Sequence, residues 1–227
     1  MTMLFLARIS LNPTHRDVQR DLGDAAQMHT TLMRLLPDGM GADPRKQANL
    51  LFRVENGPTG TTVLAQATQP LHPERLPTGY ATADVKDITG LLHAVQKGTA
   101  VRYRVDLNPT KSERRNTPTT DAPASGRPPR PRGTVRALSG PAADTWWRQR
   151  AADSGLDLHT LLPTNPAWPP RRNTGADRTT IQFTLCRYEG IGTITDPDRL
   201  RIALTEGIGR AKPYGAGLLS LLPGRTP

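Results

Sequence analysis

A basic, proline-rich stretch at residues 109–133 interrupts this chain of 227 residues and decides how the rest is divided. It mixes prolines with arginine and lysine and contains almost no apolar side chain. It therefore has too little surface to bury to offset the entropy lost on ordering. Because apolar patterns lie on both sides of it, the sequence predicts two modules, residues 1–108 and 134–227. The stretch itself is predicted to be a linker, either solvated or ordered by a bound nucleic acid.

The first module has strand and helix patterns in an order that indicates a known fold. Alternation of apolar and polar residues, or a short apolar run, predicts strands at 4–10, 50–54, 61–67 and 101–107. Asp24 is a suitable N-cap for a helix that runs to about Leu36, and helical spacing predicts a second helix at 88–95. The resulting order, β-α-β-β-α-β, is that of the ferredoxin-like fold.

The second module mirrors that order. Strands are predicted at 134–138, 181–185, 191–195 and 218–222, with a turn near Gly190 and helices at 141–152 and from Asp196 onward. The first of these helices carries Trp146 and Trp147, of which at least one is expected in the core, with base stacking as the less favoured alternative. The predicted fold class is α+β, with two tandem ferredoxin-like (βαββαβ, RRM-like) domains.

The charge of the chain indicates an anionic partner. Thirty Lys and Arg against 20 Asp and Glu give a net charge of +10, and most of the cations are arginine, whose planar guanidinium suits phosphates and base edges. A nucleic acid is therefore expected ahead of an anionic membrane. Cys186 is the single cysteine, and no Cys/His cluster has zinc-like spacing, so no metal or cofactor is expected. No apolar run is long enough to span a bilayer and no leader is apparent, so the cytoplasm is the expected compartment.

A glycine-rich stretch at 207–217 connects the last predicted helix to the last predicted strand. Glycines leave backbone N–H groups free to face an anion, and two cations add charge nearby. The stretch is therefore a candidate phosphate site; its candidate residues are Gly207, Gly209, Arg210, Lys212 and Gly215. The alternative is a tight helix-to-strand connection with solvated cations, because isolated glycine patterns are weak motifs.

Taken whole, the stretch from Gly207 to Leu221 resembles the C-terminal signature of the CRISPR-associated CasE endoribonucleases. Further matches follow in order along nearly the whole chain, and they are least certain at 112–133 and 160–178: Leu11-Asn12-Pro13, Arg20-Asp21-Leu22, Met28-His29, Asn108-Pro109-Thr110-Lys111, Trp147 and Tyr188-Glu189-Gly190. The resemblance implies two ferredoxin-like modules and processing of precursor CRISPR RNA. It also implies the repeat hairpin and the other Cascade subunits as partners.

An enzyme that cuts RNA without a metal needs a group to take the proton of the 2′-OH, a group to protonate the leaving 5′ oxygen, and cations around the phosphate. Histidine suits the proton steps because its pKa lies near neutrality. By pattern alone His29 is ambiguous, because it lies within an apolar stripe from Leu22 to Leu36 that is the usual setting of a core histidine. The resemblance implies that His29 is the general acid or base.

Two positions near His29 depart from the family pattern. Better-known members carry a tyrosine three residues before the histidine, where this chain has Ala26. Five residues after it, where relatives can carry a lysine near the scissile phosphate, stands Arg34, which could stabilise negative charge but stays protonated. Arg34 is assigned to the catalytic site on this basis; the alternative is a solvated cation at the end of the helix.

The remaining candidates are cations in loops, as expected for a protein that reads an RNA duplex through its shape and backbone. The resemblance makes each a candidate RNA contact, with a solvated surface charge as its alternative: Lys111, Arg114, Arg115, Arg171, Arg172 and Arg178. Three functions are compatible with the sequence. The first, which the resemblance implies, is a metal-independent endoribonuclease that cuts at the 3′ base of the repeat hairpin, leaves a 2′,3′-cyclic phosphate and a 5′-OH, and stays bound in Cascade. The second is a non-catalytic hairpin-binding subunit of the same fold, and the third a general RNA-binding protein.

Overall fold

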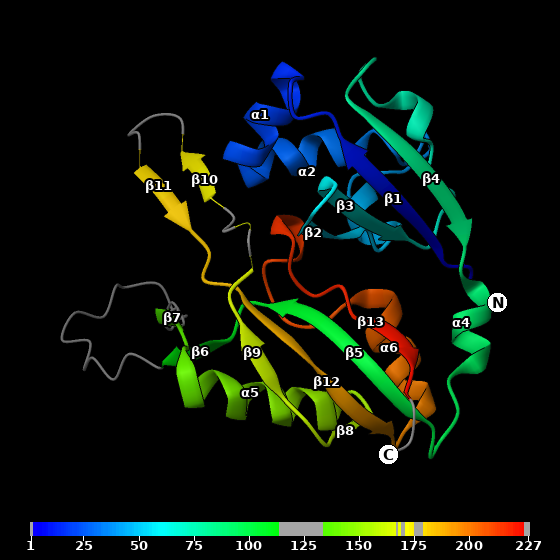
Figure 1. Ribbon diagram of the computed structural model, residues 1–227, viewed down its shortest axis with the longest axis vertical. Helices are drawn as coiled ribbons and strands as arrows, with labels where there is room; N and C mark the ends of the chain where they lie inside the picture. The colour runs from blue at the N-terminus through cyan, green and yellow to red at the C-terminus, as the bar shows by residue number, and fades with distance from the viewer. Residues whose placement is uncertain (1, 114–133, 167, 169–170, 175–178, 225–227) are drawn as a thin grey trace, which may run out of the picture.

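The computed structural model describes residues 2–113, 134–166, 168, 171–174 and 179–224, and it confirms an α+β fold built on antiparallel sheets (Figure 1). The first sheet has the strand order β2-β3-β1-β4. Its strands are β1 (Phe5–Leu11), β2 (Leu51–Gly57), β3 (Gly60–Ala67) and β4 (Ala81–Asp87). Helices α1 (Arg16–Gly23) and α2 (Ala25–Met33) bury Val18, Met28 and Leu32 against Ile9 and Val63 of this sheet.

The fourth strand of the first sheet comes from a segment that the sequence analysis did not predict. β4 pairs antiparallel with β1 from Leu11↔Ala81 to Phe5↔Asp87. It is an edge strand without a fully buried residue, so its apolar pattern is weak. The short 3-10 helix η1 (Pro73–Arg75) precedes it, where the ferredoxin-like plan would have a second helix. Helix α4 (Thr89–Ala94), predicted at 88–95, follows β4 and leads into the second sheet.

The second sheet has the order β13-β5-β12-β8, and β9 (Leu162–Thr164) also pairs with β12. Its strands are β5 (Ala100–Leu107), β8 (Leu156–Leu158), β12 (Cys186–Ile194) and β13 (Ser220–Pro223). Counted along the chain they lie in the order 4-1-3-2, and read from its β4 edge the first sheet has that order as well. Helices α5 (Gly140–Asp153) and α6 (Pro197–Glu206) bury Trp147, Leu200 and Leu204 in a second core.

The division between the sheets differs from the predicted module boundary at residue 108. The clearly alternating strand at 101–107 is β5, and it pairs with β12 from Leu107↔Cys186 to Ala100↔Thr193. It also pairs with β13, so it is the first strand of the second sheet rather than the last of the first. Alternation identifies a strand and its buried face, but it does not identify the strand that will pair with it.

Three further predictions need correction. The predicted strand at 134–138 is β7 (Thr134–Ala137), which pairs only with β6 (Thr110–Glu113) in a separate hairpin. The predicted linker therefore begins with a strand, while residues 114–133 lie outside the described part of the chain. The turn predicted near Gly190 is wrong, because β12 runs straight through it. A side chain at Gly190 would clash with the Thr160 carbonyl oxygen, which explains the glycine within a strand.

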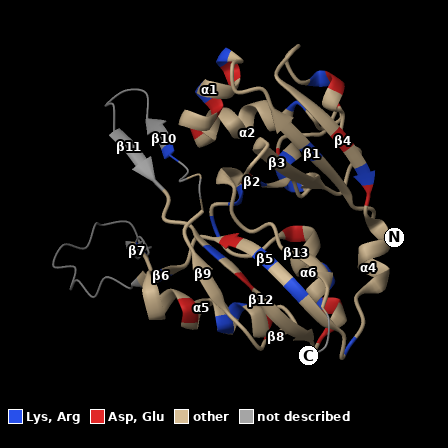
Figure 2. Ribbon diagram, viewed as in Figure 1, with Lys and Arg blue, Asp and Glu red and all other residues tan. Residues whose placement is uncertain are grey.

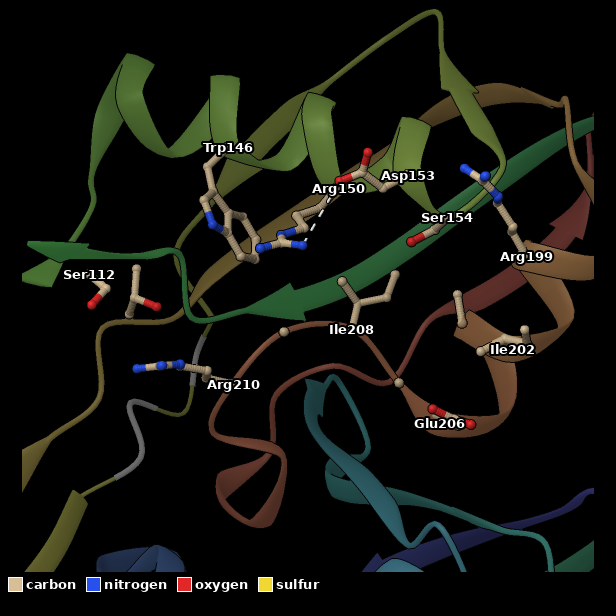
Figure 3. A pocket seen from close by; sticks show the side chains of 14 residues that line it. Ser112, Trp146, Arg150, Asp153, Ser154, Arg199, Ile202, Glu206, Ile208 and Arg210 are labelled. Carbon is tan, nitrogen blue, oxygen red and sulfur yellow. Dashed lines mark ion pairs between the residues drawn. The ribbon is translucent and has the colours of Figure 1, made fainter. Parts of the chain in front are cut away.

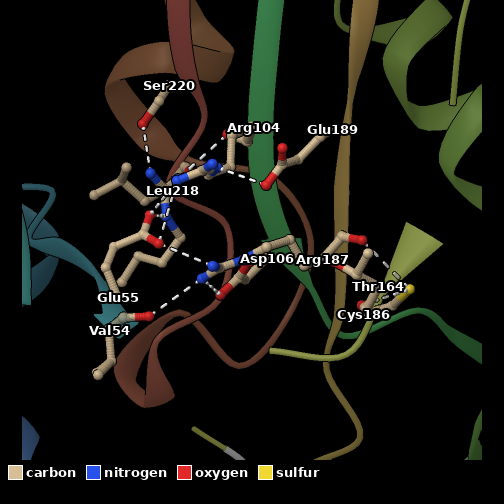
Figure 4. Close-up of polar contacts among 11 residues, drawn as sticks. Val54, Glu55, Arg104, Asp106, Thr164, Cys186, Arg187, Glu189, Leu218 and Ser220 are labelled. Carbon is tan, nitrogen blue, oxygen red and sulfur yellow. Dashed lines mark hydrogen bonds and ion pairs between the residues drawn. The ribbon is translucent and has the colours of Figure 1, made fainter. Parts of the chain in front are cut away.

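Charged side chains join the two sheets where β2 meets β5 and β12 (Figure 4). Figure 2 colours the ribbon at the positions of the charged residues. Arg187 donates two hydrogen bonds to Asp106, at 2.7 and 2.9 Å, and one to Glu55 at 2.8 Å. Arg53, only 2% exposed, donates to Glu55 at 2.7 Å and to the Leu218 carbonyl oxygen at 2.9 Å. Each guanidinium thus has a carboxylate partner, as burial of such a charge requires. Within the described ranges no helix has the length and apolar character needed to cross a bilayer.

Candidate active site and nucleic-acid interface

Helix α2 presents His29 at the margin of its buried face. The Asp24 carboxylate accepts a hydrogen bond from the Ala26 N–H at 2.8 Å and so begins the helix. The Trp168 indole N–H donates to the Leu22 carbonyl oxygen at 2.8 Å, which holds the preceding turn. Met28 and Leu32 are fully buried while His29 is half-buried. The imidazole is therefore carried on a firmly anchored helix at the edge of the core.

The surroundings of His29 favour its neutral form. Burial lowers the pKa of the imidazole, and the positive charge of Arg45 lowers it further. Arg45 is half-buried in α3 (Pro44–Gln47), sixteen residues further along the chain. A histidine that is unprotonated near neutral pH is ready to accept a proton.

The glycine-rich stretch folds back as a closed loop against α2. The Ile208 N–H donates to the Gly217 carbonyl oxygen at 3.0 Å, and the Gly217 N–H donates to the Asp106 carbonyl oxygen at 2.7 Å. The 3-10 helix η2 (Lys212–Tyr214) lies at the tip of this loop and packs on α2. Burial lowers the pKa of Lys212, and the charge of Arg45 lowers it further. The Arg45 guanidinium therefore acts electrostatically on both His29 and Lys212.

The residues of the glycine loop differ in how exposed they are to solvent and in the contacts that they make. Gly209 and Arg210 are exposed, with Gly209 at φ +77°, so backbone and guanidinium are both open to a ligand. Gly215 is buried at φ +86°, where an added Cβ would lie 3.0 Å from the Trp168 ring. Gly207 is half-buried and ends α6. The Lys212 ammonium donates to the Glu206 carbonyl oxygen at 2.7 Å, which stabilises the end of that helix.

A strand with two of the predicted arginines also reaches α2. It is β10 (Arg171–Thr174), which pairs with β11 (Thr179–Gln182) in a hairpin and lies beside α2 in the structure (Figure 1). The Arg171 side chain is exposed, and Arg172 lies in the same strand. Next along the chain, Phe183 stacks on Tyr214 of η2, with ring centroids 4.4 Å apart. The described structure thus brings the catalytic candidate, the glycine loop and the arginine hairpin together around one helix.

The other predicted residues lie just past the end of α2, on β6, or outside the described residues. Arg34 is exposed beyond the end of α2 and borders a shallow pocket of about 530 Å³ together with Asp38 and Arg75. Lys111 is exposed on β6, where it pairs in register with Arg136 of β7. The predicted contacts Arg114, Arg115 and Arg178 fall outside the described part of the chain.

Arg45 is the residue that the sequence analysis missed. It belongs to a four-residue helix outside every recognised motif, so nothing in the sequence singles it out. The charge that acts on His29 is therefore that of Arg45 and not that of a neighbour on α2. Among the described residues, no three His, Cys, Asp or Glu side chains lie close enough together to hold a metal ion.

Comparison with known proteins gives the family. The model of a family described as CRISPR associated protein matches residues 4–223. The chain belongs to this family. Among curated members it is 29% identical to the CRISPR system Cascade subunit CasE of Escherichia coli strain K12, over 88% of this chain and 92% of that one. It is 27% identical to the CRISPR-associated endoribonuclease Cse3 of Thermus thermophilus, over 97% of this chain and 100% of that one.

Solved structures of the CRISPR-associated family share this fold over nearly the whole chain. Thermus thermophilus Cse3 bound to an RNA representing a pre-cleavage complex superposes with a TM-score of 0.78 at 25% identity, covering 97% of this chain and 100% of that one. A chain of a CRISPR RNA-guided surveillance complex, pre-nicking, has a TM-score of 0.64 at 32% identity, covering 96% of this chain and 98% of that one. The similarity therefore includes both sheets and the loops that meet at α2.

Proposed function

We propose that this chain is a metal-independent endoribonuclease that cuts precursor CRISPR RNA at the 3′ base of the repeat hairpin and stays bound to the product as a Cascade subunit. The supporting observation is the meeting of His29, the glycine loop and the β10–β11 hairpin around α2. The family membership gives the class of reaction and of substrate. The compartment that we propose is the cytoplasm, where such an RNA and the other subunits would be met.

In the proposed reaction His29 is the general base. Its neutral imidazole takes the proton of the ribose 2′-OH, and the 2′ oxygen attacks the adjacent phosphorus. The bond from phosphorus to the 5′ oxygen breaks, and that oxygen takes a proton from water, because Ala26 offers no phenol at the family's second position. The products are a 2′,3′-cyclic phosphate and a 5′-OH.

Cations around His29 would hold the phosphate in line and stabilise the charge that develops on it. Arg45, whose charge acts on both His29 and Lys212, and Lys212 itself are two candidates, and Arg34 at the C-cap of α2 is a third. Arg171, Arg172 and Lys111 are proposed to contact the stem, and Arg210 a phosphate of the RNA backbone. Such contacts make binding depend steeply on salt, with a slope of roughly 0.7 to 0.9 per phosphate neutralised.

The decisive experiment is single-turnover cleavage, in EDTA, of the repeat hairpin from the CRISPR array of the source organism. We expect the wild type to cut and His29→Ala to bind equally well but to cut about 100-fold to 10,000-fold more slowly. His93→Ala is the matched control, because His93 is exposed on α4 away from α2. Mass analysis of the fragments should show the cyclic phosphate; equal rates for wild type and His29→Ala would refute the assignment of the base.

Ala26 favours one other function, a hairpin-binding subunit without nuclease activity. The same experiment separates the two, because such a subunit would bind the hairpin tightly while neither wild type nor variant cut it. A protein that binds unrelated stem-loops as tightly as the repeat hairpin would contradict both functions.

A further inference from the structure

A second cavity lies on the other side of the glycine loop, between α5 and α6 (Figure 3). Its volume is about 650 Å³. Trp146 borders it and is half-buried, unlike Trp147, which is in the core. The proposed cleavage reaction uses none of the α5 side chains that line it. The cavity therefore needs an explanation of its own.

An aromatic ring and a cation lie one helical turn apart on the α5 wall of this cavity. The Arg150 guanidinium lies 5.6 Å from the centroid of the Trp146 ring. Gly209 leaves the ring room, because a Cβ at that position would lie 3.2 Å from its edge. Arg199 and Arg210 add two more cations to the lining, against the carboxylates of Asp153 and Glu206.

The lining suits a single-stranded nucleic acid better than a protein. An indole beside guanidinium groups is the combination that binds a base by stacking and its neighbouring phosphates by charge. Among the residues that border the cavity, Ile202 is the large apolar residue that is mostly exposed to solvent, at 56%. That is little apolar surface for a docked protein, whose interface centre is mostly apolar and aromatic.

The position of the cavity along the loop relates it to the cleavage site. Arg210 borders the cavity, and Lys212, two residues further on, belongs to η2 on α2. Two residues span at most about 7 Å. The cavity therefore adjoins the loop tip that packs on α2, the helix that carries His29.

From this geometry we infer that the cavity lined by Trp146, Arg150, Arg199 and Arg210 binds unpaired nucleotides of the RNA that flank the hairpin stem, with one base stacked on Trp146. The inference rests on the proposed function, because it assumes that the stem is held at α2. It adds a single-strand subsite to a surface that otherwise reads duplex. Recognition of the flank would then favour hairpins in the setting of a long precursor over isolated stems.

The test compares two RNAs on the His29→Ala background, so that neither is cut. One is the repeat hairpin with its unpaired flanks, and the other is the same hairpin trimmed flush with the stem. We expect Trp146→Ala to weaken binding of the flanked RNA by about 5-fold to 150-fold, the loss of one base–aromatic stack. Binding of the trimmed RNA should not change. Arg148→Ala, an exposed cation on the same helix outside the lining, should show no difference between the two RNAs.

A second measurement guards against a folding defect in Trp146→Ala. Trp146→Phe keeps an aromatic ring and should stay folded, but it should lose the change in tryptophan fluorescence that the flanked RNA alone produces, since Trp147 and Trp168 are buried. Equal loss of affinity for both RNAs, no loss for either, or a flank-dependent signal that survives in Trp146→Phe would each overturn the inference. If neither RNA binds at all, the proposed function fails instead.

Discussion

At the scale of the residue, His29 combines a half-buried position with a nearby cation from another helix. Both burial and Arg45 lower its pKa, so the imidazole is neutral at pH 7. Ala26 and Met33 lie three residues before and four after it, share its face of α2, and are half-buried as well. The proton chemistry of this protein thus depends on very few side chains, and each can be tested singly.

The pH dependence of cleavage should report the lowered pKa of His29. A general base acts when unprotonated, so kcat/KM should rise as the pH increases, with the midpoint of the rise below the ordinary histidine pKa of 6.5. Removing the charge of Arg45 takes away one of the two effects that lower the pKa, so Arg45→Gln should move the rising limb to higher pH. Lys46→Gln, an exposed neighbour paired with Asp43 at 3.2 Å, should leave it in place. A falling limb with increasing pH would mean that His29 acts as an acid instead.

Restoring the family's phenol should speed the reaction. A tyrosine at position 26 would lie one turn before His29 on the same helix face and could protonate the leaving oxygen. We expect Ala26→Tyr to raise the single-turnover rate by about 100-fold or more, the usual contribution of a positioned acid. Gln27→Tyr, which places the same ring on an exposed position of the next face, should not change the rate. An Ala26→Tyr enzyme no faster than wild type would show that water already meets this need.

At the scale of the element, the glycine loop serves two surfaces at once. Its tip, η2, packs on α2, while its start, from Gly207 to Arg210, borders the second cavity. Hydrogen bonds close the loop and fix it to β5. Its shape therefore sets both surfaces, even at positions where a glycine is buried.

Gly215 shows that requirement most clearly. Gly215→Ala puts a side chain at φ +86° and against the Trp168 ring, so we expect a loss of about 1 to 3 kcal/mol in the free energy of unfolding. Gly90→Ala is the control, because Gly90 lies within α4 with open space around it, and alanine there should stabilise by about 0.5 to 1 kcal/mol. Urea denaturation measures both. An equal change in the free energy of unfolding for Gly215→Ala and Gly90→Ala would mean that the glycine loop rearranges to accommodate a side chain at position 215.

At the scale of the whole molecule, buried ion pairs join the two sheets. Arg187 is bound by Asp106 of β5 and Glu55 of β2, and Arg53 of β2 reaches back to the segment before β13. Burial raises the pKa of Asp106 despite the opposing effect of Arg187. The mutual position of the sheets, and so the position of the glycine loop over α2, depends on this charged contact as well as on the two cores.

Removing one partner from that contact should be costly. Arg187→Ala leaves the carboxylates of Asp106 and Glu55 without their cation, so we expect a loss of about 3 to 5 kcal/mol in the free energy of unfolding. Arg199→Ala breaks an exposed pair with Asp196 and should cost about 1 kcal/mol or less. Thermal or urea unfolding distinguishes the two. A small effect of Arg187→Ala would show that water replaces the lost guanidinium.

Much of the fold could be predicted from the chain alone, because local patterns carry it. Periodicity predicted the helices over 141–152 and after Asp196 and the strands that hold most of both cores. Capping chemistry predicted the start of α2 at Asp24. The missed strand β4 has little apolar surface to bury, so no periodic pattern marks it. The strand through Gly190 was missed because glycine is typical of turns. Here the glycine is needed because a side chain would clash with the Thr160 carbonyl oxygen.

By itself the sequence determined the fold class and the basic character of the surface, since these depend on residue type and on spacing along the chain. The histidine to test followed from the resemblance of the sequence to a known family. Tertiary structure alone decided which sheet receives β5, that Arg45 acts on His29, and that the glycine loop and the arginine hairpin meet at one helix. The physical reason is the same for all three. Pairing, electrostatics and packing act between residues that are close in space, and in this chain those residues are up to about two hundred positions apart.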